Sequence, residues 1–293
     1  MSAGGEIPPA PPGALAVTFA ARDGFALGGT LFRPQSPNGA AVVIHAASGV
    51  KQEYYAKFAA YLAERGFTTL TFDYRGIGRS RPASLRGFDA RMSQWATEDA
   101  AGALELIRRE VPGARVLVVG HSFGGQCLGV VPGNEHYAAL LAVASQSGYW
   151  RYWPGIGRPG MWFATHVVLP GLSKLLGYFP ARRLGQGEDL PSGVASEWAS
   201  WCRHPGYIVG ALDAKAQYAR LEMPLRAIWL ADDPYAPLPA VKALLGFYPA
   251  APGEIVEVYP RMVGAEKIGH FGFFRERFRD TLWQSAADWL MDR

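Results

Sequence analysis

Short apolar runs that recur between helix-like segments are the feature that most constrains the fold of this chain. Ala41–Ile44 reads Ala-Val-Val-Ile, and runs of similar character follow at Thr68–Tyr74, Arg115–Val119 and Ala139–Ala144. Runs without polar alternation are typical of strands buried on both faces, as in a parallel sheet. The spacing between them leaves room for a crossover helix each time. The pattern therefore predicts an α/β protein with a mostly parallel, doubly wound sheet.

The segments between these runs have the periodicity of amphipathic helices. Tyr54–Arg65 ends at Gly66, a common helix stop, and Ser93–Glu110 is a longer helical segment. A short helix is expected after Phe123. Ahead of the first buried run, two extended segments flank Asp23-Gly24, a dipeptide that favours the positive φ angles of a tight hairpin turn.

The alternation stops between residues 146 and 222, which contain helical stretches and no obvious strand. The simplest division is a flexible leader at 1–15, one α/β core at 16–145 and 223–293, and a helical insertion at 146–222. We expect helices in the insertion at Met161–Phe179 and Val194–Arg203, then strands at Leu225–Leu230 and Glu254–Tyr259 and helices at Pro239–Gly246 and Phe274–Met291.

Gly120-His-Ser-Phe-Gly124 matches the pattern G-x-S-x-G, in which two glycines allow a strand to turn sharply into a helix with the serine at the tip. The pattern alone arises by chance fairly often, but here it directly follows the apolar run Val116–Val119. We therefore interpret Ser122 as a candidate nucleophile rather than as a small residue in a tight turn.

A serine hydroxyl needs a nearby base and a carboxylate that orients that base. Of the six histidines, His270 lies in a glycine-flanked loop between the last predicted strand and the C-terminal helix. Such a loop opens at the carboxyl edge of the sheet, where the serine turn also lies. His270 is therefore the predicted base. Asp232 and Asp233 both follow the strand at Leu225–Leu230, and the residues alone leave the choice of acid between them open.

With these residues in place, the chain resembles an α/β-hydrolase-fold serine hydrolase of the esterase or lipase type with a helical cap. Four motifs carry the resemblance: Gly120-His-Ser-Phe-Gly-Gly125, Phe72-Asp-Tyr-Arg-Gly-Ile-Gly-Arg-Ser80, Asp233-Pro-Tyr-Ala-Pro237 and Gly269-His270. The candidate Ser, Asp and His residues occur in that order along the chain. The third motif selects Asp233 over Asp232. The resemblance is closest to cap-bearing members of uncharacterised function, so it implies no particular substrate.

The resemblance also implies the chemistry, which is acyl transfer through an acyl-enzyme intermediate. The family usually has His-Gly after its third strand, whereas this chain has His45-Ala-Ala-Ser-Gly49. Because the oxyanion donor at that position is a backbone N–H, alanine can still supply it. The matching position is Ala47, with Ala46 and Ser48 as alternatives, and the second donor is the amide of Phe123.

Tryptophan is concentrated in the insertion, which contains Trp150, Trp153, Trp162, Trp198 and Trp201 among nine in the chain. Large amphipathic rings often line binding surfaces. The sequence thus predicts a small-molecule ester substrate with an apolar part. The alternative is that these rings pack the cap onto the core.

Several other classes of function are disfavoured. The net charge of +4 comes with no basic block, so nucleic acid is not an expected partner. The glycine pattern at 155–160 lacks the preceding strand of a dinucleotide site, and no zinc or other metal-ligand spacing occurs, so neither a cofactor nor a metal is expected.

The remaining expectations concern location and assembly. Two sparse cysteines, Cys127 and Cys202, favour free thiols in a reducing compartment. With no signal peptide and no apolar span, a cytoplasmic protein is expected. An apolar face of the cap could also serve as a homodimer contact.

Two further functions fit the same residues. An acyltransferase would use the same Ser, His and Asp but pass the acyl group to an alcohol, amine or thiol. A non-catalytic binding protein would keep the fold while losing a member of the triad, and none is missing from this sequence.

Overall fold

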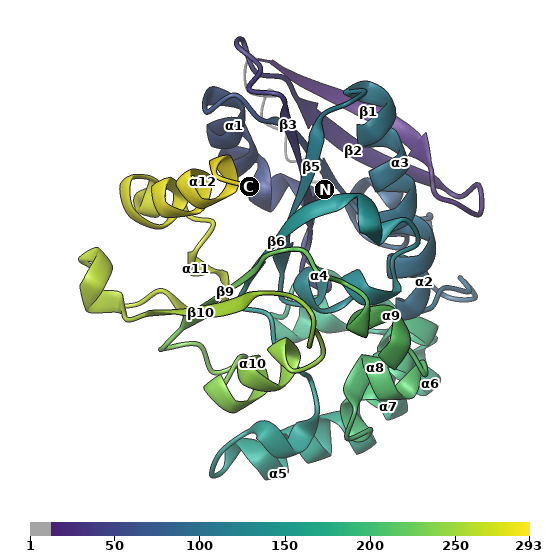
Figure 1. The fold of residues 1–293 in the computed structure, drawn as a ribbon. Coiled ribbons are helices and arrows are strands. Elements are labelled where there is room, and N and C mark those ends of the chain that lie inside the picture. Colours follow the sequence, from purple (N-terminus) through teal and green to yellow (C-terminus); the bar gives the residue numbers. More distant parts are fainter. Residues whose placement is uncertain (1–12) are drawn as a thin grey trace, which may run out of the picture.

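The computed structural model describes residues 13–293. Its strands are β1 (Ala14–Ala20), β2 (Ala26–Phe32), β3 (Ala40–His45), β4 (Thr68–Phe72), β5 (Arg115–His121), β6 (Tyr137–Val143), β7 (Tyr178–Phe179), β8 (Leu190–Pro191), β9 (Leu225–Leu230) and β10 (Gly253–Val258). Eight of them form one sheet in the order β1-β2-β4-β3-β5-β6-β9-β10 (Figure 1). The pairs from β4 to β10 are parallel, whereas β1 pairs antiparallel with β2 and β2 with β4.

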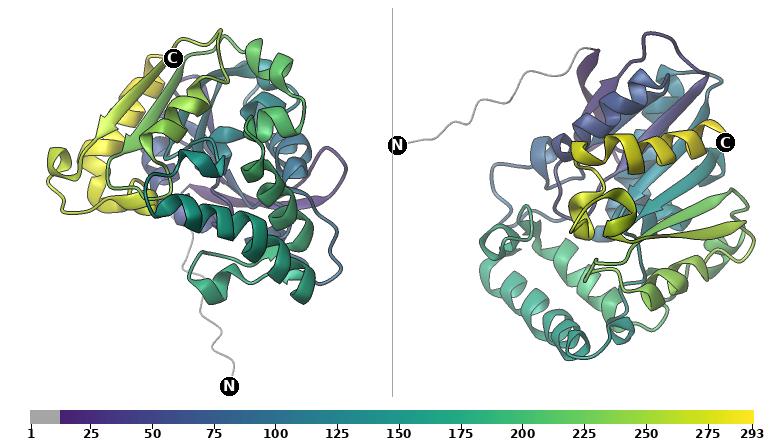
Figure 2. Two further views of the ribbon diagram at one scale, coloured as in Figure 1. Left: turned by 90° about the horizontal axis from the view of Figure 1, so that it is seen from below. Right: turned by 90° about the vertical axis from the view of Figure 1, so that its left-hand side faces the viewer.

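Helices flank the sheet on both faces. They are α1 (Ala56–Glu64), α2 (Met92–Gln94), α3 (Ala101–Glu110), α4 (Phe123–Gln126), α5 (Gly157–Phe163), α6 (Leu169–Leu176), α7 (Ser192–Arg203), α8 (Tyr207–Ala211), α9 (Lys215–Ala219), α10 (Leu238–Leu245), α11 (Gly269–Gly272) and α12 (Gln284–Met291). Figures 1 and 2 show α1 and α12 on one face of the sheet and α3 on the other. The described chain therefore has the layered α/β architecture that the sequence predicts.

Three π-helical stretches continue the α-helices beyond their regular turns. They join α2 to α3 (Trp95–Ala100), join α5 to α6 (Ala164–Val168) and precede α12 (Arg279–Trp283). Eight 3₁₀ turns complete the described secondary structure: Gln52–Tyr55, Gly78–Ser80, Leu128–Val130, Asn134–His136, Trp150–Tyr152, Ala181–Leu184, Pro260–Val263 and Glu276–Phe278.

The apolar runs form the centre of the core. Every residue of β3 and β4 is buried, and so is every residue of β5 after the first. This explains why these strands show no alternation of polar and apolar residues, since helices cover both of their faces. The antiparallel strand β1 lies at one edge of the sheet and exposes several of its residues.

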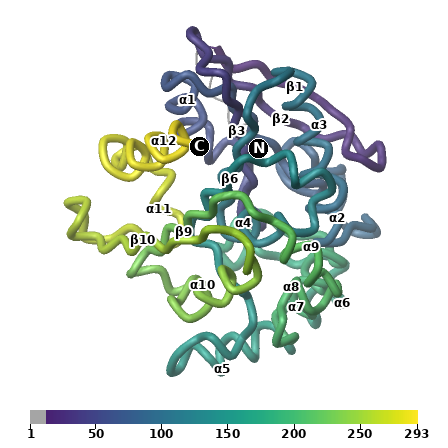
Figure 3. Tube along the Cα trace, viewed as in Figure 1, coloured from purple at the N-terminus to yellow at the C-terminus, as the bar shows by residue number. Residues whose placement is uncertain are grey.

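The chain leaves the sheet between β6 and β9, which are direct neighbours. Helices α5 to α9 lie together beyond the carboxyl ends of the central strands, as the trace in Figure 3 also shows. Two parts of the prediction for this segment are wrong. It contains the two-stranded antiparallel pair β7 and β8, and its first long helix runs from Gly157 to Leu176 and ends at Gly177, whose φ of 77° stops it.

Three other boundaries differ from the prediction. The hairpin turn spans residues 21–25 and has positive φ at Gly24 but not at Asp23, whose carboxylate instead accepts a bond from the Phe25 amide. The predicted helix at 274–291 is interrupted because Arg275 is extended and its amide closes a turn onto Gly272. Residues 1–12 of the predicted leader lie outside the described residues, and β1 already begins at Ala14.

Candidate active site

Ser122 lies in a sharp turn between the end of β5 and the start of α4. Its backbone has φ 50° and ψ −115°, a conformation that L residues rarely adopt and that is usual for a serine at such a turn. The flanking glycines leave no space for a side chain. A Cβ atom on Gly124 would lie 2.1 Å from the carbonyl oxygen of His45, and one on Gly120 would lie 2.4 Å from Gly125 Cα. The G-x-S-x-G spacing therefore has a steric cause here.

His270 and Asp233 are joined by a direct hydrogen bond. Nδ1 of His270 lies 2.7 Å from Oδ2 of Asp233, and both side chains are buried. The other carboxylate oxygen of Asp233 accepts the amide of Tyr235 at 2.8 Å. Because an ionised carboxylate can only accept, Nδ1 is the donor in this bond, and in the neutral ring Nε2 is then the acceptor.

The adjacent Asp232 has a different partner. Its carboxylate accepts the amide of Ile268 at 2.8 Å and the amide of Gly269 at 3.0 Å. Asp232 thus holds the backbone just before His270, whereas Asp233 contacts the imidazole itself. The two neighbouring acids that the sequence could not separate have distinct contacts, one with the loop and one with the ring.

Ser122 and His270 line the same pocket, which has a volume of about 230 Å³. It lies between the carboxyl ends of the strands and the segment that leaves the sheet. None of its other lining residues carries a full charge at neutral pH; they are Ala47, Ser48, Gln146, Gly148, Trp153, Met161, Ala164, Thr165, Val168, Leu169, Phe179, Ala181, Leu184, Gly185, Gln186, Leu190, Trp198, Tyr235 and Phe271. A pocket of this kind suits a neutral, largely apolar group.

The tryptophans predicted as substrate contacts divide into two groups. Trp153 and Trp198 line the pocket. Their indole N–H groups donate to the carbonyl of Pro234 and to the hydroxyl of Tyr207, respectively, so both rings are held in place.

The other three predicted tryptophans do not line this pocket. Trp150 and Trp162 both pack against His166, and Trp201 is buried against Tyr207. Trp201 is thus packed within the helical segment, whereas Trp162 remains 43% exposed.

The predicted oxyanion amides differ in their contacts. The N–H of Ala47 donates to the hydroxyl of Tyr55 at 2.9 Å, so this amide is already committed to a side chain. Ala47 and Ser48 both line the pocket, whereas Ala46 is buried and does not. The N–H of Phe123 is the first of α4, a position that has no acceptor within its own helix.

Tyr55 and His121 form a buried chain of hydrogen bonds that the sequence does not reveal. The Tyr55 hydroxyl lies 2.8 Å from Nδ1 of His121, whose Nε2 lies 2.9 Å from the backbone carbonyl oxygen of His270. A carbonyl only accepts, so Nε2 donates, Nδ1 accepts from the hydroxyl, and the hydroxyl oxygen accepts from Ala47. Burial holds the pKa of His121 well below its usual value, which keeps the ring neutral.

The Asp73 to Ser80 motif shapes a loop rather than the pocket wall. Asp73 accepts bonds from the Gln52 amide, the Gln52 side chain and the Arg79 amide at 2.8 to 2.9 Å. Arg75 pairs with the buried Asp99. Burial raises the pKa of Asp73 and of Asp99 to about 6. These residues do not line the pocket with Ser122, so we read the motif as fixing the loop after β4.

Neither cysteine lines the pocket that Ser122 and His270 share. Cys127 and Cys202 are both free and buried, and burial raises the pKa of Cys127 to about 12. Among residues 13–293, no cluster of three or more His, Cys, Asp or Glu side chains could hold a metal ion. Within the same range, no helix has the length and apolar character needed to cross a bilayer.

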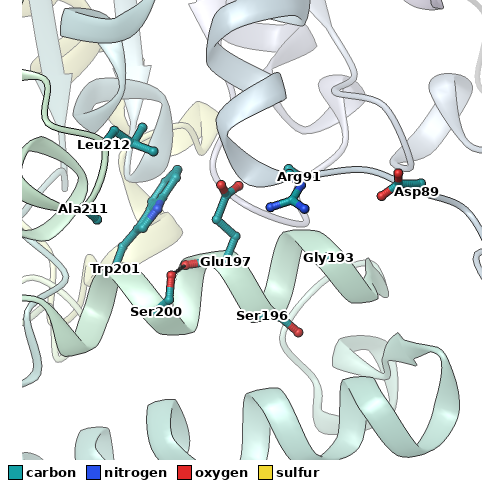
Figure 4. Close-up of a pocket in the computed structure, with 9 residues that line it drawn as sticks. All are labelled: Asp89, Arg91, Gly193, Ser196, Glu197, Ser200, Trp201, Ala211 and Leu212. Atoms are coloured by element: carbon teal, nitrogen blue, oxygen red, sulfur yellow. Dashed lines mark hydrogen bonds between the residues drawn. The ribbon is translucent and has the colours of Figure 1, made fainter.

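A separate hollow lies between the loop before α2 and helix α7. Figure 4 shows Glu197 and Trp201 projecting from α7 in this region, and the carboxylate of Glu197 accepts the amide of Ser93 at 2.8 Å. The hollow does not include Ser122 or His270, and its lining residues are Asp89, Arg91, Gly193, Ser196, Glu197, Ser200, Trp201, Ala211 and Leu212.

Comparison with known proteins places the chain in a family. Residues 41–280 match the model of the alpha/beta hydrolase family, so the chain belongs to that family and the predicted fold is confirmed.

The curated relatives match only part of the chain. One is an uncharacterised protein of Pseudomonas aeruginosa, 34% identical over 134 residues that make up 43% of this chain and 35% of that protein. Another is the uncharacterised YfhR of Escherichia coli O157:H7, 29% identical over 49% of this chain and 50% of that protein. The chain thus matches half or less of the length of these relatives.

Solved structures extend the likeness over nearly the whole chain. The esterase domain of a Rhodothermus marinus protein has a TM-score of 0.61 at 15% identity, covering 95% of this chain and 98% of that one. An esterase of Pyrococcus furiosus has a TM-score of 0.63 at 15% identity, covering 95% and 91%. At such identities the likeness shows the fold alone.

Proposed function

We propose that the protein is a serine esterase in which Ser122 is the nucleophile, His270 the general base and Asp233 the orienting acid. The observation that carries this proposal is the 2.7 Å bond between His270 Nδ1 and Asp233 Oδ2 beside a pocket that Ser122 also lines. The left-handed backbone of Ser122 and the esterase neighbours in fold support the same assignment.

In the proposed reaction, Ser122 Oγ attacks the carbonyl carbon of the ester while His270 Nε2 takes the hydroxyl proton. Asp233 stabilises the imidazolium that forms. The tetrahedral intermediate collapses as His270 gives the proton to the departing alcohol oxygen, which leaves an acyl-serine. Water, deprotonated by the same ring, then attacks the acyl carbon and releases the acid and free Ser122.

The oxyanion of the tetrahedral intermediate needs two N–H donors. The amide of Phe123 fits the first role because it opens α4 directly after the nucleophile. For the second, the bond from Ala47 to Tyr55 favours the neighbouring amide of Ser48, which lines the pocket. We therefore assign the second donor to Ser48 and not to the predicted Ala47.

The substrate class follows from the wall of the pocket. Residues of the continuous helix 157–176, such as Met161, Val168 and Leu169, line it together with Ser122. With no fully charged side chain in the wall, binding of a charged acyl group would lack a counterion. We propose neutral esters with a short to medium apolar acyl chain as substrates.

Hydrolysis of a butyrate nitrophenyl ester tests the assignment. Ser122→Ala should abolish turnover and labelling by a fluorophosphonate probe, and Ser200→Ala, an exposed serine outside the pocket, should change neither. An unchanged rate in Ser122→Ala would refute the mechanism. Adding an alcohol as a competing acceptor distinguishes acyl transfer, because a transferase would form the new ester in place of the free acid.

A further inference from the structure

The helix that lines the pocket also presents apolar residues to the outside. Six of the eleven large hydrophobic residues that the described chain exposes lie between positions 156 and 184. On the continuous helix 157–176, Phe163, Val167 and Leu175 are 53%, 45% and 78% exposed, whereas Ala164, Val168 and Leu169 line the pocket. A helix that is apolar on both faces is normally buried on both.

The same segment has basic side chains and no acidic ones. No Asp or Glu occurs between Glu135 and Glu188, and five basic residues do: Arg151, Arg158, Lys174, Arg182 and Arg183. All five are exposed. Of these, Arg182 pairs with Glu188, and the other four form no ion pair with the described residues. The segment thus combines exposed apolar side chains with exposed cations that lack ion pairs.

We propose that this outer face, defined by Ile156, Phe163, Val167 and Leu175 with Arg158 and Lys174, docks on an anionic lipid surface. Apolar side chains enter the boundary between headgroups and acyl chains, and the cations contact the headgroups. The left view of Figure 2, seen from below, shows this helix across the front of the molecule, and Figure 1 shows α5 at the end opposite β1. Nothing in the described chain covers it.

Charge complementarity favours this occupant over a second copy of the chain. In a twofold symmetric dimer the same patch faces itself, so Arg158 and Lys174 would meet the same two cations of the second copy, with no carboxylate in the segment to offset them. An anionic lipid surface attracts the same cations. The proposal goes beyond the proposed function and does not depend on Ser122, although an apolar ester substrate would concentrate at the same surface.

Sedimentation with lipid vesicles tests the proposal on the full chain. Vesicles of phosphatidylcholine alone are compared with an equal mixture of phosphatidylcholine and phosphatidylglycerol. We expect binding to the mixed vesicles, weaker binding as salt is raised, and little binding to phosphatidylcholine. The double variant Arg158→Gln/Lys174→Gln should bind the mixed vesicles about 25-fold more weakly, at about five-fold for each cation removed.

Matched controls distinguish binding through this face from non-specific adsorption to the vesicles. Arg108→Gln/Arg109→Gln removes two exposed cations from α3, and Met262→Ser removes an apolar side chain that is 65% exposed on the core. Both variants should bind as the unchanged protein does, whereas Phe163→Ser/Val167→Ser should bind less. Equal binding to both vesicle types, no binding to either, or a dimer in free solution that Phe163→Ser/Val167→Ser dissociates would each overturn the proposal.

Discussion

The hydroxyl of Tyr55 donates to Nδ1 of His121 across 2.8 Å, and this bond connects three loops of the candidate site. Tyr55 accepts the amide of Ala47 in the loop after β3, and His121 donates to the carbonyl of His270. The direction of every bond is fixed, since a backbone carbonyl cannot donate. The two side chains therefore hold the loop after β3, the serine turn and the histidine loop in one arrangement.

Tyr55→Phe tests this positioning role. The change leaves the Ala47 amide and His121 Nδ1 buried without a partner, which destabilises the fold by about 1–3 kcal/mol. With its anchor lost, the loop that carries Ser48 should align less well with the oxyanion, so kcat should fall about ten-fold while KM changes little. Steady-state kinetics and urea unfolding measure the two effects.

The control for that variant is Tyr61→Phe. Tyr61 lies on α1, and its hydroxyl contacts Arg65 and none of the three loops. The Tyr61→Phe variant should retain the full kcat of the unchanged protein. If Tyr55→Phe lowered stability without lowering kcat, Tyr55 would be a packing residue and not a positioning one.

The neighbouring acids give a second prediction. Asp233→Asn removes the charge that stabilises the imidazolium and can reverse the bond to Nδ1, so kcat should drop by about 10⁴ with the fold intact. Asp232→Asn retains one acceptor oxygen for the amides of Ile268 and Gly269, so about a ten-fold loss is expected, together with about 1–2 kcal/mol of stability.

Kinetics and thermal unfolding of the two variants side by side measure this difference. A larger loss of kcat in Asp232→Asn than in Asp233→Asn would reverse their assigned roles.

A buried histidine outside the pocket predicts how stability depends on pH. His45 is fully buried, and burial lowers its pKa to about 3, against about 6.5 in the unfolded chain. Between these values the unfolded chain binds a proton that the folded protein refuses. The contribution of His45 to the free energy of unfolding is therefore complete above about pH 6.5. Below that pH it falls by about 1.4 kcal/mol for each pH unit.

The measurement compares the unchanged protein with His45→Gln by urea unfolding. Asp73 and Asp99 act in the opposite sense, since their raised pKa values favour the folded state as pH falls through 6. They are present in both proteins, so their effect cancels in the difference. Between about pH 6.5 and 5, the unchanged protein should lose about 2 kcal/mol relative to His45→Gln. If the free energies of unfolding of the two proteins changed in parallel with pH, His45 would bind a proton in the folded protein as it does in the unfolded chain.

The sequence predicted those features whose pattern lies within a few consecutive residues. The β3 and β5 runs gave their strands directly, because burial on both faces requires apolar residues throughout. Ser122 and His270 were named from motifs a few residues long, and the structure brings both to one pocket. Their catalytic roles remain a prediction.

What the sequence did not predict arises from contacts distant in the chain or from elements too short to have a period. Tyr55 and His121 are 66 positions apart, and nothing in the Gln52–Tyr55 turn indicates such a partner. Strands β7 and β8 have two residues each, too few for any alternation to appear. The bond from the Ala47 amide to Tyr55 depends on the same distant contact, so the loop motif alone could not indicate it.

Chain-length selectivity tests which face of the helix 157–176 contacts substrate. Val168 lines the pocket and the adjacent Val167 is exposed on the outer face, so the same substitution at the two positions is a matched pair. Val168→Phe should fill part of the 230 Å³ volume and lower kcat/KM for an octanoate nitrophenyl ester about ten-fold, with little effect on the acetate ester. Val167→Phe should leave kcat/KM unchanged for both esters, because its ring would point away from the pocket. Equal losses for both esters in Val168→Phe would mean that the acyl chain does not lie along this wall.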